Sequence, residues 1–373
     1  MNKILLIGNS GLKHHSEDGQ TIKVRLYLKK MLDEGFEVQF VDLEGFLKHA
    51  FTILGKIRRG IKDCNRIVLL SAERGCKYLI PYINRHNKKH KKPFILPLIG
   101  ISVLHNDIDT LSIEKRNLFL TNHNYSLVKK NNKMSKQLQK IDYILPETDL
   151  LAEVFKEYYS LENVYTLSNF RESNAVQKQA DDNKILKIVF LSRVISMKGI
   201  FDIMSAVSNI NSDSLKVELD IYGRKSFDAE EEKEFKEYLQ KKGIKYLGLL
   251  DNSKVVDAIS HYNIFAFPTR FIGEGTPGVI VESLLAGTPV LTSNFPQAKY
   301  LLNDGKDSLF YEMFNKEELK NKLLYIINNR SVLDFMSKEA FESGKKYTYN
   351  HERNNFLKYV CGVEEKGKWK VSF

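Results

Sequence analysis

Two glutamates lie in one short segment of the sequence, in a pattern that could bind a polar ligand. Glu274 and Glu282 are eight positions apart in EGTPGVIVESLLAGTPV, and Glu282 has apolar neighbours on both sides. We therefore expect Glu282 inside a buried helix, where an unpaired carboxylate is strongly unfavourable. That helix contains no basic residue. Either a distant side chain pairs with Glu282, or a ligand with hydroxyl groups does.

The elements around the two acids predict an anion-binding helix terminus. Residues 263–275 are typical of a short buried strand followed by a loop. Thr276 and Pro277 are typical of the N-cap and the first position of a helix. The free N–H groups and the positive end of the helix dipole would then favour an anion. Gly275 and Gly278 would let a ligand approach the backbone closely.

Two cations follow the first strand of the second half of the sequence. Arg193 follows the strand predicted over 186–192, and Lys198 comes five residues later, directly before a predicted helix. An arginine forks onto phosphate oxygens and a lysine adds a point charge, so the two would suit a diphosphate. On their own, the two residues are equally typical of surface charges.

The alternation of strands and helices predicts an α/β fold class. We expect two tandem Rossmann-like, doubly wound parallel-sheet domains facing a central cleft, where such sheets bind ligands. The predicted parts are a first domain over 1–170, a polar linker over 171–184, a second domain over 185–345, and a helical tail over 346–373 that packs back on the first domain.

Composition narrows the class of protein. The chain has 373 residues, of which 43% are hydrophobic and 28% charged, as is typical of globular proteins. The longest apolar run, residues 94–104, is too short to span a bilayer. The three cysteines lack metal-binding spacing and favour a reducing compartment. We therefore expect a cytoplasmic protein without a structural metal.

The net charge of +11 is concentrated in the first 170 residues, which hold 27 Lys and Arg against 18 Asp and Glu. Residues 46–62 predict a basic amphipathic helix, and residues 85–92 are a second basic run, RHNKKHKK. One interpretation is peripheral contact with an anionic membrane; the other is a packed helix with a solvated cationic face. Both stay open. No basic motif indicates nucleic acid as a partner.

Together these segments resemble glycosyltransferase family 4, the retaining, metal-independent sugar-nucleotide transferases of the GT-B fold. The resemblance spans the second half in order, and the first half is similar in outline to transferases of polysaccharide assembly. Its motifs are LSRVISMKGI (191–200), IYG (221–223), YLGLLDNSKVVDAISHYNIFAFPT (246–269) and EGTPGVIVESLLAGTPVLTS (274–293), with ILPETDLL (144–151) and NVYTLSNF (163–170) in the first half.

The resemblance implies a role for each candidate residue. Arg193 and Lys198 would bind the donor diphosphate and stabilise it as it leaves. Glu274 would contact the transferred sugar, and Glu282 would take the two ribose hydroxyl groups. The implied catalytic residues are Glu274, Arg193, Lys198 and His105, and the implied donor-binding residues are Gly11, Arg193, Lys198, Glu274, Gly275, Thr276, Pro277, Gly278, Val279 and Glu282.

One departure from the family pattern lies after a central strand of the first domain, where relatives often carry a histidine. Gly100 occupies that place, and His105 is displaced by several residues, so its catalytic role is left open. Asp107 and Asp109 have the spacing of a donor-bound metal site. We interpret them as part of a loop turn and expect neither a metal nor a cofactor.

The implied reaction moves a hexose-type sugar from a UDP- or GDP-sugar donor to a glycan acceptor. The acceptor would be linked to polyprenyl diphosphate at the inner face of the plasma membrane, in capsule, O-antigen or exopolysaccharide synthesis. The alternatives are an inverting transferase, a sugar-nucleotide epimerase of the same fold, or a nucleotide-sugar-binding protein without transfer activity. GNSGLK departs from GxGxxG, which disfavours a dehydrogenase.

Overall fold

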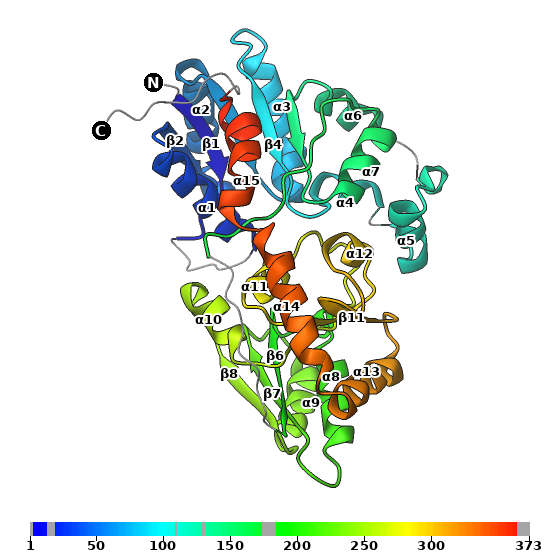
Figure 1. The fold of residues 1–373 in the computed structure, drawn as a ribbon. Coiled ribbons are helices and arrows are strands. Elements are labelled where there is room, and N and C mark those ends of the chain that lie inside the picture. The colour runs from blue at the N-terminus through cyan, green and yellow to red at the C-terminus, as the bar shows by residue number, and fades with distance from the viewer. Residues whose placement is uncertain (1–2, 13–18, 109, 129–130, 174–183, 364–373) are drawn as a thin grey trace, which may run out of the picture. The chain divides into compact units, whose positions relative to one another are not determined.

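The computed structural model describes residues 3–12, 19–108, 110–128, 131–173 and 184–363. The chain forms two compact units. Unit 1 comprises residues 1–112, 123–168 and 350–373, and unit 2 comprises residues 113–122 and 169–349. Each unit is built on a parallel sheet flanked by helices (Figure 1). The predicted α/β class with two parallel-sheet, Rossmann-like domains is confirmed.

The sheet of unit 1 has the strand order β2-β1-β3-β4-β5. Its inner strands are almost completely buried, which accounts for their continuous apolar sequences. The strands are β1 (Lys3–Gly8), β2 (Glu37–Asp42), β3 (Arg66–Leu70), β4 (Phe94–Pro97) and β5 (Tyr143–Leu145). The helices are α1 (Gly19–Asp33), α2 (Phe46–Asp63), α3 (Glu73–Asn87), α4 (Ser102–Ile108), η1 (Tyr125–Leu127), α6 (Asn132–Leu138) and α7 (Asp149–Tyr159).

The C-terminal residues return to unit 1 through α15 (Tyr349–Asn355) and the π-helical segment η4 (Phe356–Cys361). The ring of Phe356 packs edge-on against Tyr27, with 5.1 Å between the ring centroids. Tyr359 stacks on Tyr165 at 4.7 Å between centroids. These aromatic contacts tie the segment to both α1 and the stretch that follows β5.

The sheet of unit 2 has the strand order β11-β10-β9-β6-β7-β8, with all pairs parallel. The strands are β6 (Leu186–Leu191), β7 (Val217–Tyr222), β8 (Ile244–Gly248), β9 (Ile264–Phe267), β10 (Val290–Ser293) and β11 (Ser308–Tyr311). The helical segments are α5 (Ile113–Thr121), η2 (Ser196–Lys198), α8 (Ile200–Ile210), α9 (Ala229–Leu239), η3 (Asn252–Lys254), α10 (Val255–Ser260), α11 (Gly278–Leu285), α12 (Ala298–Leu301), α13 (Lys316–Asn328) and α14 (Val332–Lys345).

Helices cover both faces of the second sheet. Ile188 and Phe190 of β6 face a core shared with α8, α9 and α13. Val189 and Leu191 face the opposite core, shared with α10, α11 and α12. This alternation along one strand is what a doubly wound sheet requires.

Candidate functional site

The loops after β6 and β9 lie side by side because the two strands pair in parallel. Gly199, at the end of η2, has φ 72°, and a Cβ there would come within 1.7 Å of the Pro268 carbonyl oxygen. Only glycine lets this turn sit against the loop after β9. The amide of Arg270 also donates to the carbonyl of Met197, at 2.9 Å. The turn that carries Lys198 is therefore fixed to the loop that carries Glu274.

Lys198 and Glu274 form a buried ion pair. Their side chains are 11% and 9% exposed, and the Lys198 ammonium donates to Oε1 of Glu274. The hydroxyl of Thr269 donates to the same oxygen at 2.7 Å. The ammonium also lies 5.5 Å from the ring centroid of Phe267. Oε2 of Glu274 has no hydrogen-bond partner among the described residues, which leaves it available to a ligand.

The loop that carries Glu274 is anchored to the rest of unit 2. Arg270 forks onto the buried carboxylate of Asp202 in α8, at 2.7 and 2.5 Å. The hydrogen bond with Asp202 is the main cause that raises the pKa of Arg270. The hydroxyl of Ser293 donates to the carbonyl of Thr269 at 2.6 Å. The candidate site is therefore built on a preorganised loop.

The helix after this loop begins one residue later than predicted. α11 starts at Gly278, and Pro277 occupies the N-cap position that the sequence assigned to Thr276. Proline has no side chain that could cap the helix, and none caps it here. Val279 is half-buried in the first turn. The predicted free N–H groups and positive dipole end therefore begin at Gly278, without the side-chain cap expected from Thr276.

Glu282 pairs with a distant side chain. Nε of Arg171 donates to its Oε1 at 2.7 Å, and the two side chains are 10% and 13% exposed. The sequence placed Arg171 in a polar linker over 171–184, which is wrong at this residue because Arg171 is buried in unit 2. Residues 174–183 lie outside the described residues. Oε2 of Glu282 has no hydrogen-bond partner in the described part of the chain.

The remaining candidates of unit 2 are not all brought together. Arg193 follows β6 as predicted, but it is exposed and makes no side-chain hydrogen bond or ion pair to any described residue. Gly275 is half-buried in the anchored loop. Thr276 is buried, and its carbonyl accepts a hydrogen bond from Asn169 at 2.9 Å. The sequence did not predict a role for Asn169, Thr269 or Arg171. The one signal was Glu282, because a buried carboxylate without a nearby base indicates that a distant cation pairs with it.

The candidates of unit 1 lie after β1 and β4, in loops and in helix α4. Gly11 has φ 67°, and its amide donates to the Asn9 side chain at 3.1 Å. Gly100 has φ 54°, in the left-handed region that favours glycine. His105 lies in α4, and its side chain is outside what the structure describes.

The predicted loop turn around Asp107 is instead helical, because α4 extends to Ile108. The Asp107 carboxylate accepts hydrogen bonds from Tyr159 at 2.8 Å and from Asn131 at 3.3 Å. Asp109 lies outside the described residues. Within residues 3–363, gaps excepted, no three His, Cys, Asp or Glu side chains gather as a metal site would require.

A buried ion pair in unit 1 was not foreseen. The ammonium of Lys23 in α1 donates to Glu147 at 2.6 Å and to the carbonyl of Leu98 at 2.8 Å. The side chains of the pair are 2% and 4% exposed. The second oxygen of Glu147 accepts a longer contact, 3.4 Å, from the amide of Gly100. The pair therefore holds the backbone of the loop after β4.

The basic helix α2 has both a packed face and an exposed one. Ile53, Ile57 and Ile61 are buried, whereas Leu47 and Phe51 are 93% and 94% exposed. The isoleucines of α2 are thus buried in unit 1, whereas Leu47 and Phe51 of the same apolar pattern face solvent. None of the helices in the described ranges is both long enough and apolar enough to cross a membrane.

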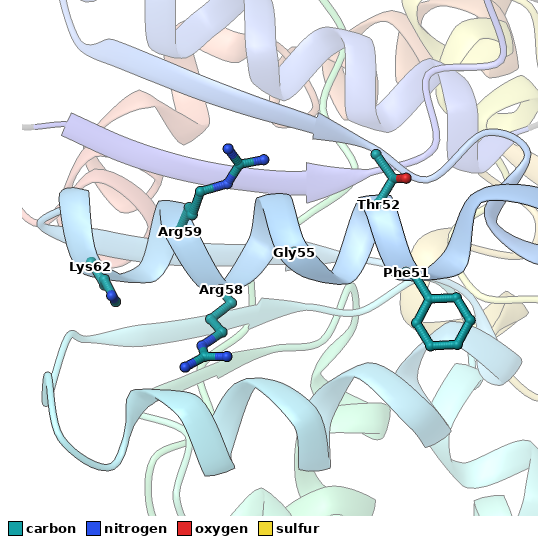
Figure 2. A pocket seen from close by; sticks show the side chains of 6 residues that line it. All are labelled: Phe51, Thr52, Gly55, Arg58, Arg59 and Lys62. Carbon is teal, nitrogen blue, oxygen red and sulfur yellow. The ribbon is translucent and has the colours of Figure 1, made fainter.

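An open groove of about 540 Å³ runs along this exposed face. Figure 2 shows Phe51, Arg58 and Lys62 projecting from the same side of α2, as their helical spacing requires. Thr52, Gly55 and Arg59 complete the lining. The guanidinium of Arg58 also lies close enough to α3 to act on His86, whose pKa is lowered by burial and then by Arg58 and Arg85.

The segment that contains Glu274 and Glu282 is similar to a known family of proteins. Residues 171–343 match the family model described as "Glycosyl transferases group 1". The matched range begins at Arg171 and contains Arg193, Lys198, Glu274 and Glu282.

Two curated proteins are similar to part of the chain. The poly(glycerol-phosphate) alpha-glucosyltransferase of Bacillus subtilis is 23% identical over 219 residues, which are 52% of this chain and 32% of that protein. The capsular polysaccharide biosynthesis glycosyltransferase CapM of Staphylococcus aureus is 26% identical over 214 residues, 51% of this chain and 53% of that protein. The chain thus spans about a third and about half of these relatives.

Among solved structures, the chain is similar to Anabaena HepE in complex with UDP and glucose. The TM-score is 0.69 at 13% identity, and the match covers 97% of this chain and 100% of that chain. At this identity the likeness shows the fold alone, and it confirms the GT-B fold class expected from the sequence.

Proposed function

We propose, from the group 1 glycosyltransferase segment at residues 171–343, that this chain is a retaining, metal-independent glycosyltransferase of family 4. It moves a hexose from a nucleoside-diphosphate sugar to a glycan of the cell surface. The carrying observation is the geometry around α11. Two carboxylates, Glu274 and Glu282, each keep one oxygen without a hydrogen-bond partner among the described residues, on either side of an uncapped helix terminus.

Each part of the donor has a matching group in unit 2. The free oxygen of Glu274 accepts from hydroxyl groups of the sugar, and that of Glu282 accepts from hydroxyl groups of the ribose. Ionised carboxylates only accept hydrogen bonds, so sugar and ribose hydroxyls are suitable donors. The N–H groups of Gly278 and Val279 face an anion at the positive end of the helix dipole.

The chemical step depends on stabilising the leaving diphosphate. Negative charge grows on the bridging phosphate oxygen as the bond to the sugar breaks, and preorganised cations and N–H dipoles lower the barrier most when they already face that charge. Lys198 is held in place by the anchored turn, and Arg193 is exposed and unpaired within the described residues, so both cations can serve a phosphate. Retention of configuration rests on the family resemblance.

The proposed substrates follow from similar proteins. HepE was solved with UDP and glucose, and the two curated relatives are named for glucosyl transfer to poly(glycerol phosphate) and for capsular polysaccharide synthesis. We therefore propose a UDP-hexose donor and a cell-surface glycan acceptor, linked to polyprenyl diphosphate. The membrane contact that this acceptor requires is assigned to α2, through Leu47, Phe51 and the cations beside them.

The proposal is tested by a donor panel on the purified full chain. UDP-glucose, UDP-galactose and GDP-mannose are each incubated with and without EDTA, and the UDP or GDP released as water takes the sugar is measured. We expect release from one donor, unchanged by EDTA, because metal-independent stabilisation of the leaving group comes from the protein. Loss of release in EDTA would disprove metal independence.

Two further measurements separate the alternatives. Nuclear magnetic resonance of the glycosylated product reports whether the anomeric configuration is retained, and inversion would identify an inverting transferase. A nucleoside diphosphate at ~100 times its dissociation constant adds roughly 2.7 kcal/mol of stability, which a thermal-shift assay detects. A thermal shift with UDP but no hydrolysis of any of the three donors would favour a binding protein without transfer activity.

A further inference from the structure

Arg171 reaches the first turn of α11 from a backbone that is itself fixed. The amide of Arg171 donates to the carbonyl of Tyr347 at 2.8 Å, and its carbonyl accepts from the amide of Tyr349 at 2.9 Å. Residues 171 and 348 form a parallel β-bridge. The side chain therefore starts from a defined position in unit 2.

The guanidinium is held on three sides. Nη1 donates to the Asn169 side chain at 3.0 Å and to the carbonyl of Phe170 at 3.1 Å. Nε donates to Oε1 of Glu282 at 2.7 Å. Asn169 in turn donates to the carbonyl of Thr276 at 2.9 Å, directly before the helix. Segment 169–171 thus clamps both the start of α11 and the acid one turn inside it.

Gly278 accommodates this guanidinium. A Cβ at Gly278 would come within 1.6 Å of Nη2 of Arg171. Positions 278 and 282 are four apart and share one face of the helix. The guanidinium therefore spans the first turn along that face. The sequence assigned Gly278 to close approach of a ligand, but in the structure the missing Cβ makes room for the Arg171 guanidinium.

We propose that Arg171 is a positioning residue for the donor nucleotide. It binds Oε1 of Glu282 and supplies the charge that compensates the buried carboxylate, so that Oε2 is oriented to accept from the ribose hydroxyl groups. A planar guanidinium with fixed donor directions suits this task better than an ammonium does. This inference rests on the proposed function, because it assigns the nucleotide ribose to Glu282.

The test measures ribose recognition rather than activity alone. Dissociation constants of UDP and 2′-deoxy-UDP, and of GDP and 2′-deoxy-GDP, are measured by calorimetry for wild type, Arg171→Met and Arg171→Lys. Wild type should prefer the ribonucleotide by about tenfold or more, because a hydrogen bond to a charged group is lost with the 2′-hydroxyl. In Arg171→Met the preference should fall towards one, and Arg171→Lys should lie between the two.

A matched control loses a different buried hydrogen bond in the same helix. Ser283 in α11 donates to the carbonyl of Thr288 at 2.7 Å and does not contact Glu282. Ser283→Ala should be less stable than wild type but should keep the wild-type ribose preference. If Arg171 had only a structural role, Arg171→Met would behave in the same way. If Arg171→Met does not fold, Gly278→Ala displaces the guanidinium instead and should lower the preference.

The two proposals fail in different ways. A wild-type protein that prefers UDP or GDP over its 2′-deoxy form, together with an Arg171→Met variant of unchanged preference, overturns the role of Arg171 and leaves the transferase intact. A wild-type protein that binds neither UDP nor GDP overturns the proposed function, and the role of Arg171 with it.

Discussion

At the scale of single residues, the proposed donor site contains two buried ion pairs, each joining one acid to one base. Lys198 compensates Glu274, and Arg171 compensates Glu282. In both pairs the base contacts only Oε1, so each acid keeps a second acceptor. Burying a charge without a partner is costly, so the pairs allow two acids in an apolar setting before any donor binds.

Lys198→Ala removes a cation from the proposed diphosphate site. We expect kcat/KM to fall by ~10²–10³, the loss typical when one preorganised donor to a developing negative charge is removed. The measurement is steady-state donor turnover, with circular dichroism to verify the fold. Lys320→Ala breaks an exposed pair with Glu317 in α13 and should leave kcat/KM unchanged. Unchanged kcat/KM in Lys198→Ala would remove this residue from the diphosphate site.

The identity of the second pair marks a limit of sequence reasoning. The apolar neighbours of Glu282 predict its burial, and burial predicts a partner. Its partner is 111 positions away, in a segment whose polar composition indicates a linker. Local periodicity carries no information about such pairing, since it depends on how the chain returns beside α11.

At the scale of elements, the strands were the most predictable part, because buried parallel strands have continuous apolar sequences. The apolar alternation of segment 163–167 also favours a strand, but the segment contributes only a bridge between Val164 and Ile144. The sequence of segment 125–138 favours one continuous helix, whereas its described residues form two short helical segments, η1 and α6. Asn131 caps α6 by accepting from the Met134 amide, a start signal that the apolar pattern concealed.

The loop after β4 is held by a long-range ion pair that no local sequence pattern predicts. Lys23 binds both Glu147 and the carbonyl of Leu98. Lys23→Met should lower the free energy of unfolding by about 3–5 kcal/mol, because it removes the cation of a buried ion pair and leaves the carboxylate of Glu147 buried. Urea unfolding monitored by circular dichroism provides the measurement.

The control for Lys23→Met is an exposed pair of the same type in the same unit. Lys3 pairs with Glu37 at 3.0 Å, with side chains 29% and 52% exposed. Lys3→Met should cost less than about 1 kcal/mol, because solvent screens such pairs. A double variant, Lys23→Met with Glu147→Leu, should recover part of the loss. Equal costs for Lys23→Met and Lys3→Met would show that the buried pair does not stabilise this loop.

At the scale of the whole molecule, the two halves of the chain differ more in net charge than in fold. Both units have parallel sheets, yet the first 170 residues hold nine more Lys and Arg than Asp and Glu, out of a total net charge of +11. In α2 the basic residues that contribute to this excess lie beside two solvent-exposed apolar side chains, Leu47 and Phe51. A solvated cationic face alone would not account for that exposure, whereas an anionic lipid surface complements both.

We therefore expect the full chain to co-sediment with phosphatidylglycerol vesicles at low salt and to dissociate as salt screens the charges. Arg58→Gln with Lys62→Gln should weaken binding about 30-fold, since each charge near an anionic surface contributes about 1 kcal/mol. Leu47→Ser with Phe51→Ser should weaken it at all salt concentrations, because the apolar contribution is not screened. These two different salt dependences would show that both charged and apolar side chains of α2 contact the lipid.

The matched control removes the same charge elsewhere. Lys233→Gln with Lys241→Gln changes two exposed lysines of unit 2, at α9 and just after it, and should leave binding unchanged. Equal losses in both double variants would indicate attraction by net charge alone, without a role for α2. Absence of wild-type binding at low salt would exclude the lipid contact. The donor site proposed around α11 would be unaffected by that result, because Lys198, Glu274 and Glu282 lie in unit 2 and bind a soluble nucleotide sugar in the proposed reaction.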